Sequence, residues 1–178
     1  ILDKYPDIKA ARDCNKKIIV YAPTFRKHRD ISLEIKELID KIKSDERVIV
    51  IKKHPLMKLC IEDRPGVIID DTFSTEEMLY IADCVIADYS AIVFEAALLN
   101  KPMCFYAFDL DEYMASRSFY LDYEKDMPGA ICKDVDEVET VLKDFHFDLE
   151  AVRNFAHNYV EKTEGVTKEL ANLVLMDN

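Results

Sequence analysis

Residues 82–97 constrain the fold most, because they predict a buried strand that runs directly into a helix. Residues 84–87 are apolar at every position, which is typical of a parallel strand covered by helices on both faces. From Ile92 to Leu99, apolar residues recur at helical spacing. The polar residues between the two elements include Ser90, which is a good candidate for the N-cap of the helix.

A helix that begins at this point would direct the backbone N–H groups of Ala91 and Ile92 toward the end of the strand. Such groups have no partner within the helix and carry the positive end of its dipole. The pattern therefore predicts an anion-binding position. It would lie at the carboxyl end of a strand, where open α/β sheets bind their ligands.

Strands and helices alternate along the rest of the chain, and Ser74 and Glu77 have the spacing of a capping box. The predicted strands are residues 17–22, 47–52, 67–70, 84–87, 103–106 and 130–132. The predicted helices are residues 32–44, 74–82, 92–99, 135–144, 149–162 and 166–176, whereas residues 109–128 are rich in aromatics and show little periodicity. This order predicts a single α/β domain over residues 1–178 with a Rossmann-like, doubly wound parallel sheet.

Composition narrows the possible functions. The net charge of −11 argues against nucleic-acid binding. The five cysteines are scattered, and Cys84, Cys104 and Cys132 lie in apolar runs, which indicates reduced core residues of a cytosolic protein. No apolar run approaches the length of a membrane span. The first residues include neither Met nor a secretory segment, so we expect a piece of a longer chain.

Two basic clusters go against the acidic balance, and each follows a predicted strand. Thr24 and Arg26 come after the first strand, and Lys53 and His54 come after the second. In the usual Rossmann-like order these two strand ends meet the end of the central strand at the switch point. The sequence therefore predicts a site for phosphate groups of two or more charges. It has neither the G-x-G-x-x-G nor the Walker A pattern, which argues against a dinucleotide dehydrogenase or a P-loop kinase.

Together these segments resemble the CDP-glycerol glycerophosphotransferase family of teichoic-acid polymerases and primases. The matching stretches follow one another over nearly the whole chain: residues 21–26, 53–55, 82–95, 100–102, 105–106 and 113–129. The sequence departs from the family pattern at two places. Ala91 stands where a second serine is common, and Ser118 follows Arg117 where a glycine is usual.

The resemblance implies the C-terminal half of a GT-B fold, in which two Rossmann-like domains face each other across a cleft. This half binds the nucleotide donor, and helices within residues 149–178 would pack back toward the missing N-terminal acceptor domain. The implied reaction moves glycerol phosphate from CDP-glycerol to a teichoic-acid-like or capsular polymer. CDP-ribitol is an equally suitable donor, and the acceptor would be a polyol phosphate or a glycan. We expect the isolated fragment to be inactive and the parent to be cytoplasmic, peripheral at the inner face of the plasma membrane.

His54 matches a family histidine, and it is flanked by Lys53 and Pro55. A histidine in a loop is often only structural. At a strand end beside lysines, however, its imidazole would stabilise charge on the pyrophosphate as it breaks, so we take His54 as catalytic. Lys53 would bind the donor phosphates. The sequence shows no carboxylate pair at metal-ligand spacing, so we expect neither an essential metal nor another cofactor.

The remaining candidates bind the donor. Arg26 is either a surface arginine or a phosphate clamp, and we favour the clamp because its fork suits bidentate contact. Thr24 lies beside it. Arg117 would clamp either the donor phosphate or the acceptor, or would only stack on Tyr120. Further candidates are Asp88, which would orient the site, the anion-binding pair Ser90 and Ala91, and Glu95, which either pairs with a lysine or binds ribose hydroxyls as in GT-B enzymes.

Two other functions fit the same sequence. One is a GT-B glycosyltransferase domain, which would prefer a UDP- or GDP-sugar as the donor. The other is a non-catalytic nucleotide-binding module, which would bind without turnover.

Overall fold

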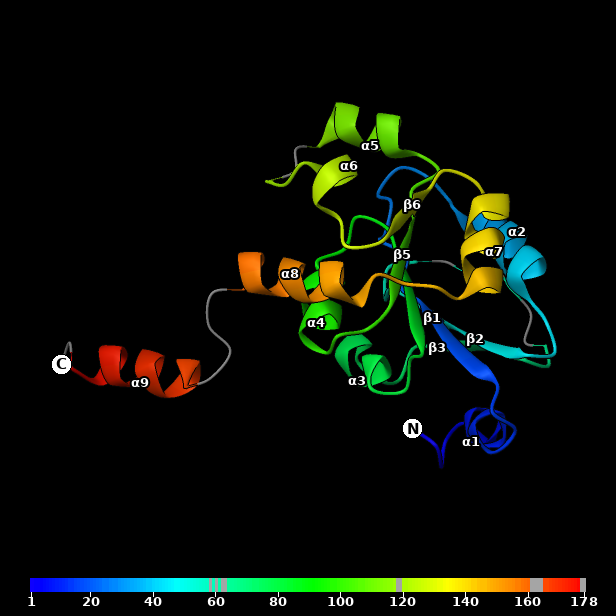
Figure 1. Ribbon diagram of the computed structural model, residues 1–178, viewed down its shortest axis with the longest axis horizontal. Coiled ribbons are helices and arrows are strands. Elements are labelled where there is room, and N and C mark those ends of the chain that lie inside the picture. The colour runs from blue at the N-terminus through cyan, green and yellow to red at the C-terminus, as the bar shows by residue number, and fades with distance from the viewer. Residues whose placement is uncertain (58, 60, 62–63, 118–119, 161–164, 177–178) are drawn as a thin grey trace.

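The computed structural model covers residues 1–178 and describes all of them except residues 58, 60, 62–63, 118–119, 161–164 and 177–178 (Figure 1). The strands are β1 (Lys17–Tyr21), β2 (Arg47–Lys52), β3 (Val67–Asp70), β4 (Cys84–Ala87), β5 (Met103–Tyr106) and β6 (Ala130–Cys132). The helices are α1 (Pro6–Asp13), α2 (Ser32–Ile42), α3 (Thr75–Leu79), α4 (Ile92–Leu98), α5 (Leu110–Ser116), α6 (Tyr123–Asp126), α7 (Val135–Asp144), α8 (Leu149–Tyr159) and α9 (Val166–Met176).

The strands form one parallel sheet in the order β3-β2-β1-β4-β5-β6, which confirms the predicted Rossmann-like class. The order reverses between β1 and β4, so their adjacent carboxyl ends form the switch point. In this register Tyr21 of β1 pairs with Ile51 of β2 on one side and with Ile86 of β4 on the other. The loops that follow β1, β2 and β4 therefore leave the sheet side by side.

Helices cover both faces of the sheet, as the apolar strands require. Along β1, side chains alternate between two cores. Val20 packs in one core with residues of α1, α3, α4 and α8. Ile19 and Tyr21 pack in the other with residues of α2 and α7. Cys84, Cys104 and Cys132 are buried and free, as expected of core residues, whereas Cys60 lies outside the described residues.

Some elements differ from the sequence prediction. The segment over residues 109–128 contains two helices, α5 and α6. Among their described residues, only Leu110 of α5 and Tyr123 of α6 are buried, so neither helix shows a recurring apolar face in the sequence. Helix α1 was not predicted either, because only Ile8 and Ala11 of its eight residues are buried. The capping box at Ser74 and Glu77 is confirmed, since each side chain bonds the backbone N–H of the other residue.

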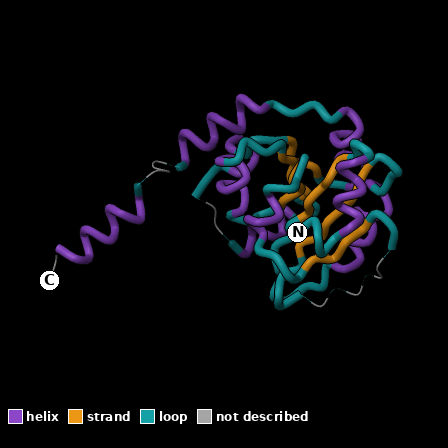
Figure 2. Tube along the Cα trace, turned by 90° about the horizontal axis from the view of Figure 1, so that it is seen from below, coloured by secondary structure: helices purple, strands orange, loops and turns teal. Residues whose placement is uncertain are grey.

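The two C-terminal helices lie differently. Helix α8 packs on α4, where Phe155 stacks on Phe94 with ring centroids 5.4 Å apart. Helix α9 lies apart from the sheet and its covering helices in both views (Figures 1 and 2). The expected packing of this region against a preceding domain stays a prediction. Among the described helices, none combines the length and the apolar character needed to cross a bilayer.

Gly129 lets β6 approach β5 closely, because a Cβ atom at this position would lie 2.2 Å from the carbonyl oxygen of Met103. We predict that Gly129→Ala lowers the free energy of unfolding by about 1–3 kcal/mol, the usual cost of overpacking. Urea denaturation measures this change. Ala130→Ser, at the exposed neighbouring position, should have little effect, and equal midpoints for Gly129→Ala and wild type would contradict the prediction.

Candidate functional site

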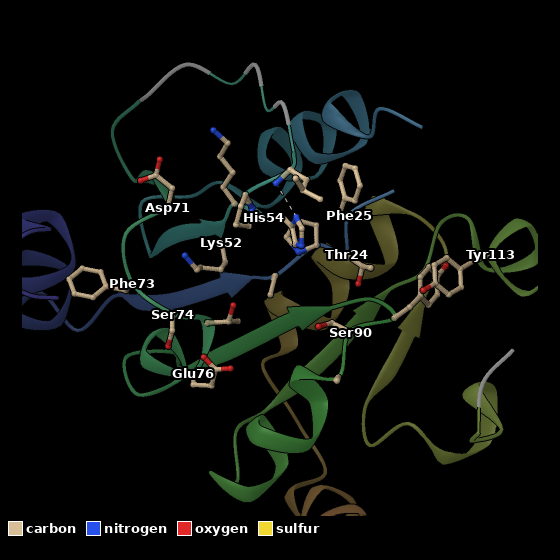
Figure 3. Close-up of a pocket in the computed structure, with 18 of the residues that line it drawn as sticks. Thr24, Phe25, Lys52, His54, Asp71, Phe73, Ser74, Glu76, Ser90 and Tyr113 are labelled. Carbon is tan, nitrogen blue, oxygen red and sulfur yellow. Dashed lines mark hydrogen bonds between the residues drawn. The ribbon is translucent and has the colours of Figure 1, made fainter. Parts of the chain in front are cut away.

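A cavity of about 1080 Å³ lies at the carboxyl ends of the central strands (Figure 3). Loops after β1, β2, β3 and β4 line it, together with the end of α5. Six of the predicted site residues belong to its lining: Thr24, Lys53, His54, Ser90, Ala91 and Arg117. Residues far apart in the sequence therefore meet at the predicted switch point.

The imidazole of His54 is oriented by two contacts. Its Nδ1 accepts a hydrogen bond of 3.2 Å from the backbone N–H of Leu56. Its ring stacks on Phe25, with centroids 5.4 Å apart and planes 13° from parallel. Because Nδ1 accepts, the neutral ring carries its proton on Nε2, which leaves that atom to donate to a ligand.

The two lysines at the end of β2 differ in what they contact. Lys52 forms an ion pair of 2.8 Å with the buried carboxylate of Asp70, which also accepts from the hydroxyl of Tyr5 at 2.6 Å. Burial alone would raise the pKa of Asp70, but the hydrogen bonds from Lys52 and Tyr5 hold it below its usual value. Burial and Asp70 together raise the pKa of Tyr5 to about 12. Lys53, in contrast, forms no ion pair with any residue that the structure describes, so its charge remains available.

The start of α4 differs in detail from the prediction. The N-cap position is occupied by Ala91 and not by Ser90. The hydroxyl of Ser90 nevertheless accepts a hydrogen bond of 3.3 Å from the N–H of Ile92. The expectation that the Ile92 N–H is free was therefore wrong, because a serine just before a helix readily bonds the backbone two residues on. Both Ser90 and Ala91 still line the cavity.

Arg26 is buried in a network beneath the cavity and is not part of its described lining. Its guanidinium contacts Asp88 at 3.1 Å and Asp109 at 2.9 Å, with side-chain exposures of 7%, 0% and 4%. It also donates to the carbonyl of Thr24 at 2.8 Å. The rings of Tyr89 and the nearby Tyr113 lie 4.8 and 5.1 Å from the guanidinium carbon. The guanidinium is thus engaged by protein groups.

Burial and charge act in opposite directions in this network. Burial raises the pKa of Asp88, although Arg26 and the hydrogen bonds from Thr24 oppose the shift. Burial would also raise the pKa of Asp109, but hydrogen bonds from Arg26 and charge attraction lower it. The pKa of Arg26 lies above its ordinary value because the two carboxylates outweigh its burial. A charged guanidinium is thus held in place between the loops after β1, β4 and β5.

Asp88 connects these loops directly. Its carboxylate accepts from the backbone N–H of Thr24 at 2.9 Å, from the hydroxyl of the same threonine, and from the N–H of Tyr89 at 2.6 Å. Its backbone carbonyl accepts from the hydroxyl of Tyr123 at 2.9 Å. Asp88 therefore ties the loop after β1 to the loop after β4, and its predicted role in orienting a donor site stays a prediction.

Glu95 and Arg117, which the sequence predicts to bind the donor, lie in different environments. Glu95 lies on α4 outside the described cavity lining, and the structure gives its buried Oε2 no hydrogen-bond partner among the described residues. Arg117 is exposed at the cavity rim, and its guanidinium carbon lies 5.8 Å from the ring centroid of Tyr113. The predicted alternative partner Tyr120 is fully exposed. Ser118 lies outside the described residues.

Sequence reasoning missed Asp109 and three tyrosines of the network: Tyr89, Tyr113 and Tyr123. Tyr89 bonds Asp109 through its hydroxyl at 2.9 Å. A signal for Asp109 existed, because it lies in the loop directly after β5, only three residues beyond its end. The segment that follows shows little periodicity, so the sequence did not link Asp109 to Arg26. Within the described ranges, no three His, Cys, Asp or Glu side chains gather as a metal site.

Comparison with known proteins assigns the chain to a family. Residues 8–175 match the family described as CDP-Glycerol:Poly(glycerophosphate) glycerophosphotransferase. The chain belongs to this family. The teichoic acid poly(ribitol-phosphate) polymerase of Bacillus spizizenii is 33% identical over 93% of the chain and 28% of its own length. The teichoic acid glycerol-phosphate primase of the same organism is 33% identical over 89% of the chain and 43% of its own length.

Solved structures show the same fold in larger proteins. The wall teichoic acid polymerase TagF superposes with a TM-score of 0.73 at 24% identity, over 98% of the chain and 48% of TagF. A TagF structure soaked with CDPG gives a TM-score of 0.68 at 25% identity over 98% of the chain and 47% of its own length. The glycosyltransferase SnogD of Streptomyces nogalater gives 0.55 at 15% identity over 88% of the chain and 43% of its own length. The chain thus has the fold of one half of a GT-B enzyme and spans less than half of these glycerophosphotransferase relatives.

The buried charge network generates a prediction about stability. Arg26→Met leaves the carboxylates of Asp88 and Asp109 without their cation, so the free energy of unfolding should fall by about 3–5 kcal/mol. Arg29→Met is the matched control, because Arg29 also bridges two carboxylates, of Glu34 and Glu112, but is 36% exposed. It should cost less than about 1 kcal/mol. Equal losses in chemical denaturation would show that burial of the network does not matter.

Proposed function

We propose that this chain is the donor-binding half of a transferase that moves an alditol phosphate from CDP-glycerol or CDP-ribitol to an acceptor. The acceptor is a polyol phosphate or a glycan, as in teichoic-acid-like or capsular polymers. The observation that carries the proposal is the large cavity at the switch point, where His54, Lys53 and Arg117 meet the start of α4. Family membership supports the same chemistry.

The charges around the cavity favour one orientation of the donor. Cationic side chains lie after β2 and at the end of α5, whereas Asp71 and Glu76 line the side formed by β3 and α3. A diphosphate is attracted to the first side and repelled from the second. We therefore place the diphosphate beside Lys53, His54 and Arg117. Arg26 holds the wall behind it instead of clamping a phosphate.

Transfer forms a bond between an acceptor hydroxyl oxygen and the β-phosphorus. The bond from that phosphorus to the bridging oxygen breaks, and CMP leaves with its electron pair. The hydroxyl proton goes to a general base in the acceptor-binding half of the enzyme. Positioning and charge neutralisation supply most of the catalysis in such reactions. His54 contributes by donating from Nε2 to the leaving phosphate as charge develops there.

Calorimetric titration of this chain tests donor binding. We expect CDP-glycerol and CDP-ribitol to bind more tightly than UDP-glucose, by about tenfold or more, which corresponds to about 1.4 kcal/mol. CMP should bind more weakly than CDP because it lacks the second phosphate. A preference for UDP-glucose would support the glycosyltransferase alternative. If the chain does not bind CDP at millimolar nucleotide, the proposal is wrong.

Substitution of His54 tests catalysis in the complete enzyme. We predict that His54→Ala lowers turnover by about two orders of magnitude, with donor affinity nearly unchanged, because the imidazole acts mainly on the transition state. The fold should persist, since His54 is exposed. His146→Ala, an exposed histidine in the connection from α7 to α8, is the control. If His54→Ala turns over at nearly the wild-type rate, the catalytic assignment is wrong and His54 has only a structural role.

A further inference from the structure

A second cavity, of about 350 Å³, opens beside the donor cavity. The two cavities share Phe25, Tyr113 and Arg117 as common wall. Figure 3 shows Phe25 and Tyr113 on the side of the donor cavity opposite Phe73 and Ser74. The loop after β1 forms the rest of the second cavity with Asp109 and Glu112. A ligand here would therefore adjoin the donor without occupying its site.

Some charged side chains of this second cavity are paired with an opposite charge of the protein, and others are not. Both of its carboxylates are engaged, because Asp109 bonds Arg26 and Glu112 bonds Arg29 at 2.7 Å. Lys27 and Arg117 form no ion pair with the part of the chain that the structure describes. Lys27 and the neighbouring His28 are exposed. The unneutralised groups in the cavity are thus cationic on a chain with a net charge of −11.

We propose that the second cavity binds a phosphate group of the acceptor polymer, with Lys27 and His28 as its ligands. This inference rests on the proposed function, and it gives the donor half of the enzyme a part in acceptor binding. In a polyol-phosphate chain, the terminal hydroxyl and the nearest phosphate belong to the same repeating unit. A hydroxyl placed at the donor's β-phosphorus therefore brings an anion into the adjoining cavity. The family description names poly(glycerophosphate), which is such a polyanion.

Titration of this chain with a synthetic four-unit glycerol phosphate oligomer tests the proposal. We expect Lys27→Glu to weaken oligomer binding by roughly tenfold, since an attraction becomes a repulsion. The affinity for CDP should change less than about twofold, because the two sites are separate. Lys9→Glu, a charge reversal at an exposed position on α1, is the matched control. An uncharged glycerol oligomer should not bind.

Each outcome decides one point. Oligomer binding that survives Lys27→Glu, or that Lys9→Glu weakens equally, overturns the proposed phosphate site. Loss of CDP binding in Lys27→Glu also overturns it, by placing Lys27 in the donor site. If wild type binds CDP but not the oligomer, the acceptor inference fails and the proposed function stands. If wild type binds no CDP, the proposed function fails first. In the complete enzyme, Lys27→Glu should raise the KM for a polyol-phosphate acceptor and leave that for the donor unchanged.

Discussion

The ion pairs that Arg26 makes with Asp88 and Asp109 hold the candidate site together. They join three loops that follow different strands, and hydrogen bonds from Thr24 to Asp88 and from Tyr89 to Asp109 add direct links between the same loops. Placing the charges out of water is costly, and the attraction offsets that cost only when geometry and further hydrogen bonds are complete. Thr24 and Tyr89 supply such bonds. These contacts order the cavity wall within the protein itself, so the proposed donor would not have to fix the loops on binding.

The positive charges near the site serve two purposes. Arg26, Arg29 and Lys52 are bound by carboxylates of the protein and build its structure. For Lys53, Arg117 and Lys27 the described residues offer no carboxylate partner, and these are the groups that we propose for phosphate binding. The sequence does not reveal whether a basic residue pairs with a carboxylate of the protein or remains available to a ligand. That depends on where the fold places the carboxylates.

The sequence predicts the sheet and the residues at its edge, but not the ion pairs between distant loops. The sheet could be predicted because its strands are continuous apolar runs between clear helical periods. His54 and Lys53 could be placed at the cavity because strand ends of a parallel sheet meet at one edge. The partners of Arg26 could not be predicted, since Asp109 is 83 residues away. The short helices α5 and α6 were not predicted either, because each buries a single residue among those described and so shows no apolar face.

Helix α9 exposes Leu170, Leu173, Val174 and Leu175 by 57–72% while standing apart from the sheet and its covering helices. An isolated helix of its eleven residues is marginal in water, because nucleation is costly and few hydrogen bonds follow. Its helicity is thus decoupled from the cooperative unfolding of the sheet. Amide hydrogens there exchange with solvent at the rate of local fraying, whereas those of β1 and β4 wait for global opening. The free energy of fraying α9 therefore differs from that of unfolding the sheet, and a melting curve reports only the unfolding of the sheet.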